Sequence, residues 1–182
     1  METTTHRRVG LATAMVAAHL HPLPVIGIAL SAGAAWLFSG GATSPDVDNQ
    51  PAAKTLDRWL PDEWLGHGGP LGHRRLAHWW GLPALAAAAW QRHPPADPGL
   101  LTWVVWGALL GWCSHLAGDF AFGQGNGRVG LARGVPAGPW FWHIGLGWKA
   151  DGWMQRLTGW LADGVSVWAL LTLFPALARY WP

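Results

Sequence analysis

Five long apolar stretches constrain this chain more than any other feature of its sequence. They cover residues 9–20, 25–39, 79–90, 100–122 and 160–181 of 182. A helix that crosses a bilayer needs about 20 apolar residues, with about 17 as a lower limit. The fourth and fifth stretches meet this length, and the first three do so only with flanking polar residues included. Because most stretches are too long for strands and poor in β-branched alternation, we predict an all-α fold.

The composition favours a membrane protein. Charged residues make up 12% of the chain and apolar residues 51%, whereas soluble domains carry about 25% charged residues. Ten of the 16 Trp lie at or just outside the ends of apolar stretches, where an aromatic belt at the headgroup level would place them. The predicted architecture is a polytopic transmembrane bundle of about five helices, forming one domain over residues 1–182. A very apolar soluble helical domain with a Trp-rich core is the alternative.

Charge and cysteine content exclude other classes of protein. The net charge of +2 gives no reason to expect a nucleic-acid partner. The single cysteine, Cys113, excludes an internal disulfide framework and a multi-cysteine zinc site.

The basic residues predict how the bundle is oriented. If five helices alternate in direction, the N-terminus and two long segments, 40–78 and 123–159, lie on one side. That side carries ten Lys and Arg, and the other side carries two. Such an excess marks the cytoplasmic side, so we expect a multi-pass protein with two long cytoplasmic loops. A cleavable leader after Arg7 and Arg8 is disfavoured because His and Pro interrupt the apolar run.

Two pairs of polar residues near the ends of apolar stretches have the chemistry of metal ligands. His115 and Asp119 are four residues apart late in the fourth stretch, so both face one side of a helix. Together they can offer an imidazole nitrogen and a carboxylate oxygen to one ion. Asp46 and Asp48 follow the second stretch, and paired carboxylates in a turn suit a cation. The alternatives are an intramembrane His–Asp hydrogen bond and an ordinary Asp-rich turn.

Further histidines precede the third and first stretches. His73 and His78 bracket a basic segment before the third stretch, and Arg74 beside them suits an anionic substrate group. His6 lies at the start of the first helix. In isolation the basic segment is equally well explained as a loop that only sets the topology.

The predicted topology brings these four groups together, because starts of odd helices and ends of even helices share one side of an up-down bundle. We therefore predict a metal site at the cytoplasmic interface, with ligands His6, Asp46, Asp48, His73, His78, His115 and Asp119. One or two divalent ions are expected. Zinc is the expected metal, with manganese or iron as alternatives.

These motifs, in this order, resemble the YdjM-like family, which is described as LexA-regulated inner-membrane proteins and predicted metal-dependent hydrolases. The matching motifs are Thr5-His6, Pro45-Asp46-Val47-Asp48, the segment from Gly72-His73-Arg74 to His78, and Ser114-His115 to Asp119. The resemblance spans Thr5 to about Phe122, with a looser match through Arg156. It implies an inner-membrane location and a hydrolytic activity.

The chain departs from the family pattern at several positions. Asn49 stands where the family often has His, and Arg75 and Ala77 stand where it often has Gly and Thr. A late acidic residue of the family corresponds to Gln155, or is shifted to Asp151. His143 lies on the same side of the predicted bundle, where a peripheral ligand and an interfacial anchor are the two alternatives for it.

The leading functional prediction is a membrane-bound, metal-dependent hydrolase. Its substrate is expected to be a phosphoester or a lipid-linked molecule at the cytoplasmic headgroup interface, attacked by a metal-activated water. Asp48 is the expected general base, and Arg74 holds the anionic substrate group. One alternative is a non-catalytic membrane protein whose His/Asp cluster binds or senses a divalent cation. Another is a structural or partner-binding membrane protein with a vestigial site.

Overall fold

A computed structural model describes residues 3–21, 23–40, 81–92, 99–122 and 152–178. Within these ranges the chain is helical and has no strand. The helices are α1 (Thr3–Leu20), α2 (Val25–Gly40), α5 (Gly81–Arg92), α6 (Leu100–Phe122) and α7 (Trp153–Ala178). Each predicted apolar stretch corresponds to one of these helices, so the all-α prediction is confirmed for this part of the chain.

Two helices begin earlier than the apolar runs indicate. Helix α7 starts at Trp153, so the prediction of a loop through residue 159 is wrong over its last seven residues. This first part of α7 mixes apolar and polar residues and therefore escapes a search for apolar runs. Its Gln155 is nevertheless buried. Helix α1 starts at Thr3, which places His6 inside its first turns.

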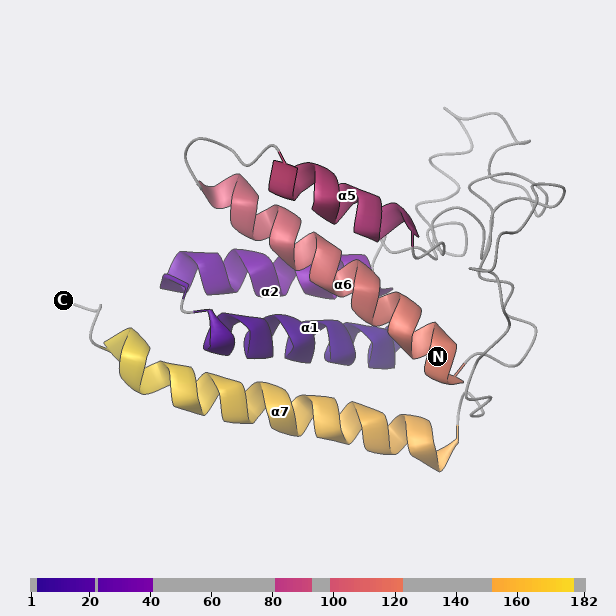
Figure 1. Ribbon diagram of the computed structural model, residues 1–182. Coiled ribbons are helices and arrows are strands. Elements are labelled where there is room, and N and C mark those ends of the chain that lie inside the picture. The colour runs from indigo at the N-terminus through magenta and orange to yellow at the C-terminus, as the bar shows by residue number, and fades with distance from the viewer. Residues whose placement is uncertain (1–2, 22, 41–80, 93–98, 123–151, 179–182) are drawn as a thin grey trace, which may run out of the picture.

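Successive helices run in alternating directions (Figure 1). Helix α2 packs against both α6 and α1, α7 packs against α1, and α5 makes a smaller contact with α6. The starts of α1 and α7 and the ends of α2 and α6 therefore lie at one end of the bundle. This is the up-down arrangement predicted from the sequence.

Glycines allow the helices of the central layer to approach closely. A Cβ atom on Gly107 would collide with the backbone of Ser31, and one on Gly111 would collide with the backbone of Ala35. Small residues at such crossings bring helix backbones together, as expected for this face of α6. Gly10 of α1 lies in the same way against the end of α2.

One described helix is long and apolar enough to cross a membrane. It is α6, over Leu100–Asp119, and only 28% of this segment is buried. The fifth apolar stretch, in α7, is also long enough by the sequence prediction, but α7 is not among the candidate spans found in the described residues.

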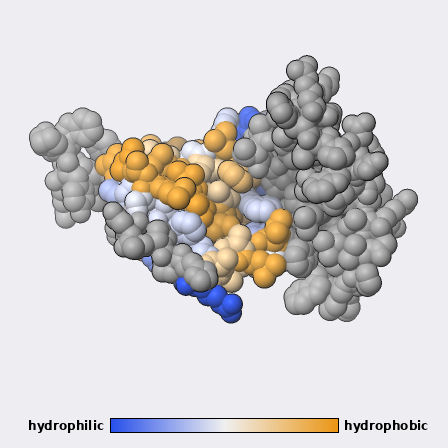
Figure 2. Space-filling model, turned by 90° about the horizontal axis from the view of Figure 1, so that it is seen from above, coloured by the Kyte–Doolittle hydropathy of each residue, from blue (hydrophilic) through white to orange (hydrophobic). Residues whose placement is uncertain are grey.

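Large apolar side chains are exposed on most of the helices (Figure 2). Helix α7 exposes the most of them: Trp153, Trp160, Leu161, Val167, Trp168, Leu170 and Leu171 are each at least half exposed. Single exposed apolar residues are ordinary on soluble proteins, but large contiguous patches mark contact with a partner or a membrane. The multi-pass arrangement remains a prediction.

Candidate metal centre

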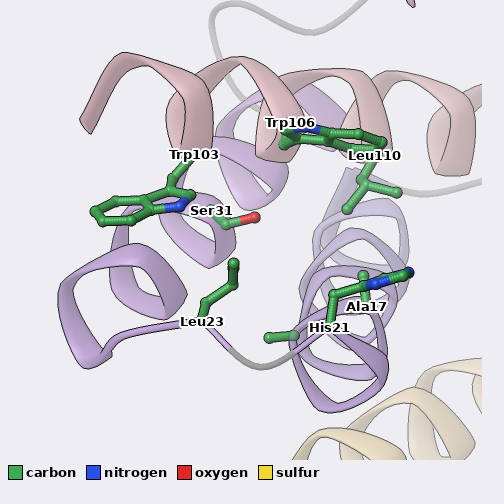
Figure 3. Close-up of a pocket in the computed structure, with 8 residues that line it drawn as sticks. Ala17, His21, Leu23, Ser31, Trp103, Trp106 and Leu110 are labelled. Atoms are coloured by element: carbon green, nitrogen blue, oxygen red, sulfur yellow. The ribbon is translucent and has the colours of Figure 1, made fainter. Parts of the chain in front are cut away.

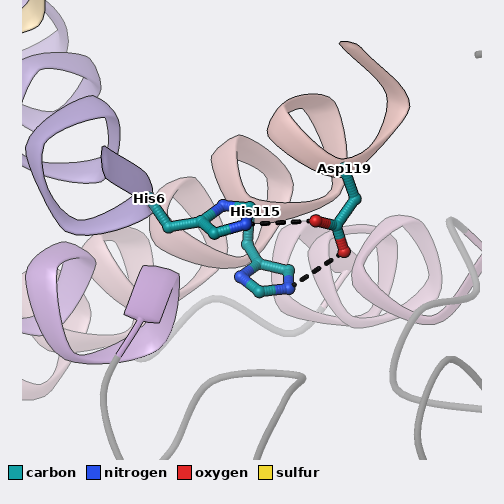
Figure 4. Close-up of side chains that lie close together, drawn as sticks. All are labelled: His6, His115 and Asp119. Carbon is teal, nitrogen blue, oxygen red and sulfur yellow. Dashed lines mark ion pairs between the residues drawn. The ribbon is translucent and has the colours of Figure 1, made fainter. Parts of the chain in front are cut away.

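Helices α1 and α6 bring His6, His115 and Asp119 together at the end of the bundle where α1 begins (Figure 4). His6 Nε2 lies 3.1 Å from Asp119 Oδ1, and His115 Nε2 lies 3.3 Å from Asp119 Oδ2. Each residue offers one ligand atom, and these atoms lie within 4.8 Å of one another. All three side chains are buried. The four-residue spacing on α6 acts as predicted, since it turns both side chains towards α1.

The spacing of these atoms fits a metal ion. Zinc has bonds of about 2.0–2.1 Å to such ligands, so in a tetrahedral site the ligand atoms are about 3.3 Å apart. The two N–O distances of 3.1 and 3.3 Å, each to a different oxygen of Asp119, are close to this value, and one ligand atom from each residue lies within 4.8 Å of the others. Two histidines and one carboxylate, with further positions open, are the protein ligands of catalytic zinc sites and of non-haem iron(II) sites. The donor set supports a divalent cation and does not select one metal.

The end of α2 orients His115. Its Nδ1–H donates a hydrogen bond of 2.7 Å to the backbone carbonyl of Ser39, one of the last carbonyls of α2, which lack partners within the helix. This assigns the proton to Nδ1 and directs the Nε2 lone pair at the Asp119 carboxylate. Two lone pairs facing each other repel unless a proton or a metal ion lies between them. Metal-binding histidines usually have such an outer partner.

The contacts of His6 also suit a bound cation. Its ring stacks on that of His115, with centroids 4.0 Å apart. Its Nδ1 has no hydrogen-bond partner among the described residues, and the polar neighbour of its Nε2 is Asp119 Oδ1 at 3.1 Å. A buried polar atom left unpaired costs about 1–3 kcal/mol. A metal ion between the imidazole and the carboxylate would satisfy both groups.

The protonation of His6 also suits a metal. The residue precedes the apolar stretch 9–20, and burial lowers the pKa of its imidazole from 6.5 to about 4. The ring is therefore neutral near pH 7. Neutral imidazole is the form that binds metal ions.

The neighbouring residue Arg7 fixes the end of α2 that carries Ser39. Its Nε donates a hydrogen bond of 2.9 Å to the carbonyl of Gly40. Its guanidinium lies 4.3 Å from the ring centre of Trp36, in a cation–π contact. A Cβ on Gly10 would collide with the Ser39 side chain, so only glycine allows α1 to lie this close. The carbonyl that orients His115 is thus held from the α1 side.

Helix α7 adds a buried amide beside the site. Gln155 Nε2 donates a hydrogen bond of 3.4 Å to Thr5 Oγ1, and both side chains are buried. Thr5 directly precedes His6 in α1, so Gln155 contacts the residue next to a candidate ligand. As an amide it brings no negative charge.

Of the seven predicted ligands, the structure brings together His6, His115 and Asp119. The other predicted site residues lie outside the described residues and remain predictions: Asp46, Asp48, His73, Arg74 and His78. The same holds for four further positions singled out in the sequence: Asn49, Ala77, His143 and Asp151. Sequence reasoning missed the role of Ser39. Its position in the last turn of a helix ending on the same side as His115 was the available signal.

No protein-family model, curated protein or solved structure matches the chain. Function is therefore argued from the geometry of the site.

Proposed function

We propose that the protein is a multi-pass membrane hydrolase that uses a divalent metal ion. Its substrate is a phosphoester or a lipid-linked molecule, which it cleaves at the cytoplasmic headgroup interface. The buried cluster of His6, His115 and Asp119 carries this proposal. Its ligand atoms lie within 4.8 Å of one another. Burying imidazole nitrogens and a carboxylate costs free energy unless they are hydrogen-bonded, paired or bound to a metal ion, and one cation can bind all three of these groups.

The position of the cluster supports a substrate at a membrane surface. His115 and Asp119 lie in the last two turns of α6, the helix apolar enough to span a bilayer. The end of such a helix reaches the headgroup region. The excess of basic residues on this side of the chain supports a cytoplasmic location and suits an anionic headgroup.

The chain's own residues have distinct tasks in this proposal. His6, His115 and Asp119 hold the cation, and the Ser39 carbonyl keeps the His115 ring in its binding orientation. A bound divalent metal would supply Lewis acidity and lower the pKa of a coordinated water towards about 7. Arg74 binds the anionic group of the substrate, and Asp48 acts as the general base that accepts a proton from the attacking water.

The test combines metal content with turnover. The protein, purified in mild detergent, is analysed by inductively coupled plasma mass spectrometry and assayed on phospholipids and lipid phosphomonoesters in mixed micelles. We expect at least one metal per chain and loss of both metal and turnover in His115→Ala. The matched control is His19→Ala, which removes a histidine from the other end of α1 and is expected to retain both. Full turnover in His115→Ala would refute the proposal.

A second candidate is a non-catalytic protein that binds or senses a divalent cation. The neutral Gln155 beside the centre favours it, since a carboxylate there would be better suited to proton transfer. This candidate predicts metal that is lost in His115→Ala, together with no turnover on any ester tested. Replacing Gln155 by Glu distinguishes the two further, because only a hydrolase can gain turnover from that change.

A further inference from the structure

A separate cavity of about 290 Å³ lies between α1, α2 and α6, at the end of the bundle away from the metal centre (Figure 3). Its walls are largely apolar. They include Leu23 of the α1–α2 link and Trp103, Trp106 and Leu110 of α6. His21 and Ser31 add polar groups, and the Ser31 hydroxyl points into the space between the helices.

The tight helix contact between the two sites separates them. Gly111 of α6 lies against the backbone of Ala35 of α2, so no side-chain-sized space is left at this crossing. Leu110 at the near end of the cavity is five residues before His115, which is about 7.5 Å along the helix axis. The cavity is therefore not a part of the metal centre.

We propose that this cavity binds the hydrocarbon chain of a membrane lipid. Its volume is near the lower end of the range for ligand sites, about 300–1,000 Å³. The lining residues Trp103 to Leu110 cover about 10 Å of the α6 axis, a length that accommodates several methylene groups of an alkyl chain. The scarcity of polar lining groups excludes a strongly hydrated ligand.

The surroundings of the cavity also point to a lipid. Large apolar side chains close in sequence to its lining residues are exposed: Leu20, Val25, Ile26, Leu100 and Leu101. The cavity is partly open, so a longer chain can extend beyond it. His21, exposed at the α1–α2 link, offers a polar partner for the headgroup end. The inference depends on the proposed membrane location of α6 and is independent of any metal chemistry.

Photo-crosslinking tests this directly. The full chain in mild detergent is illuminated with a long-chain fatty acid that carries a diazirine in its alkyl chain, and the labelled peptides are identified by mass spectrometry. We expect labelling to concentrate in residues 17–23 and 103–110 and to be competed by unlabelled palmitate. Even labelling of all exposed apolar helix faces, with no competition, would overturn the proposal.

Cavity-filling variants provide the second arm. Ala17→Leu and Ser31→Leu each add side-chain volume to the cavity lining and are expected to lower the labelling of residues 103–110 at least threefold. The matched control Ala86→Leu places the same side chain on an exposed position of α5 and is expected to leave labelling unchanged. Far-UV circular dichroism and gel filtration check that each variant is folded. A folded filling variant that labels like the parent protein would refute the site, whatever its metal content.

Discussion

Replacing Asp119 by Asn is expected to remove most of the metal-dependent stability of the protein. The carboxylate lies 3.1 Å from His6 Nε2 and 3.3 Å from His115 Nε2, and its side chain is 7% exposed. Asn keeps the size of the side chain and removes its charge. The substitution therefore changes the ligand while largely preserving the packing around it.

The size of the effect follows from linkage between binding and folding. Zinc at 100 times its dissociation constant stabilises a protein that binds it only when folded by about 2.7 kcal/mol. Loss of an outer-shell partner alone weakens metal binding about 10–100-fold, so loss of a charged ligand is expected to weaken it at least 100-fold. At the same zinc concentration the variant then gains about 0.4 kcal/mol or less.

Thermal unfolding in detergent, with zinc or with a chelator, measures this difference. For a chain of this length, about 2.7 kcal/mol corresponds to a rise in Tm of about 5–10 °C. Asp163→Asn is the matched control, because Asp163 is half exposed and pairs with Arg8 at 3.4 Å, away from the cluster. Exposed pairs of this kind contribute about 0–1 kcal/mol. An equal zinc-dependent rise in Tm for Asp119→Asn and the parent protein would refute the metal centre.

Three further outcomes are expected. Gly10→Ala forces the Ser39 turn away from α1 and is expected to weaken zinc binding about tenfold, as measured by a chelator competition titration. The control is Gly33→Ala, whose added methyl group meets no atom within 4 Å and is expected to leave zinc binding unchanged. Arg7→Ala loses its hydrogen bond and its cation–π contact, and denaturant unfolding is expected to show a loss of about 1–2 kcal/mol; an unchanged midpoint would contradict this. Burial lowers the pKa of His6 to about 4, so between about pH 6.5 and pH 4 the unfolded chain binds a proton that the folded chain does not. The free energy of unfolding of the metal-free protein is therefore expected to decrease as the pH is lowered through this window. His6→Gln is expected to flatten that dependence, and an unaltered slope would count against it.

The prediction that His6, His115 and Asp119 lie together is confirmed, and it depended on local rules. The four-residue spacing on a helix places His115 and Asp119 on one face. Alternating helix directions then place the start of α1 beside the end of α6, which brings in His6. The same rules failed for the first part of α7, because the buried Gln155 breaks the apolar run that marks a helix from sequence.

The helices, and the end of the bundle at which the polar groups lie, could be predicted from the sequence, because hydrophobic periodicity and chain reversal act over short segments. Which groups meet at that end depends on how the helices pack. The Ser39 carbonyl reaches His115 across 76 residues of sequence, and Gln155 reaches Thr5 across 150. Such contacts depend on how closely two helix surfaces fit, which here depends on glycines such as Gly10 and Gly111. The apolar cavity beside α6 has the same origin, since its volume is what the packing of three helices leaves unfilled.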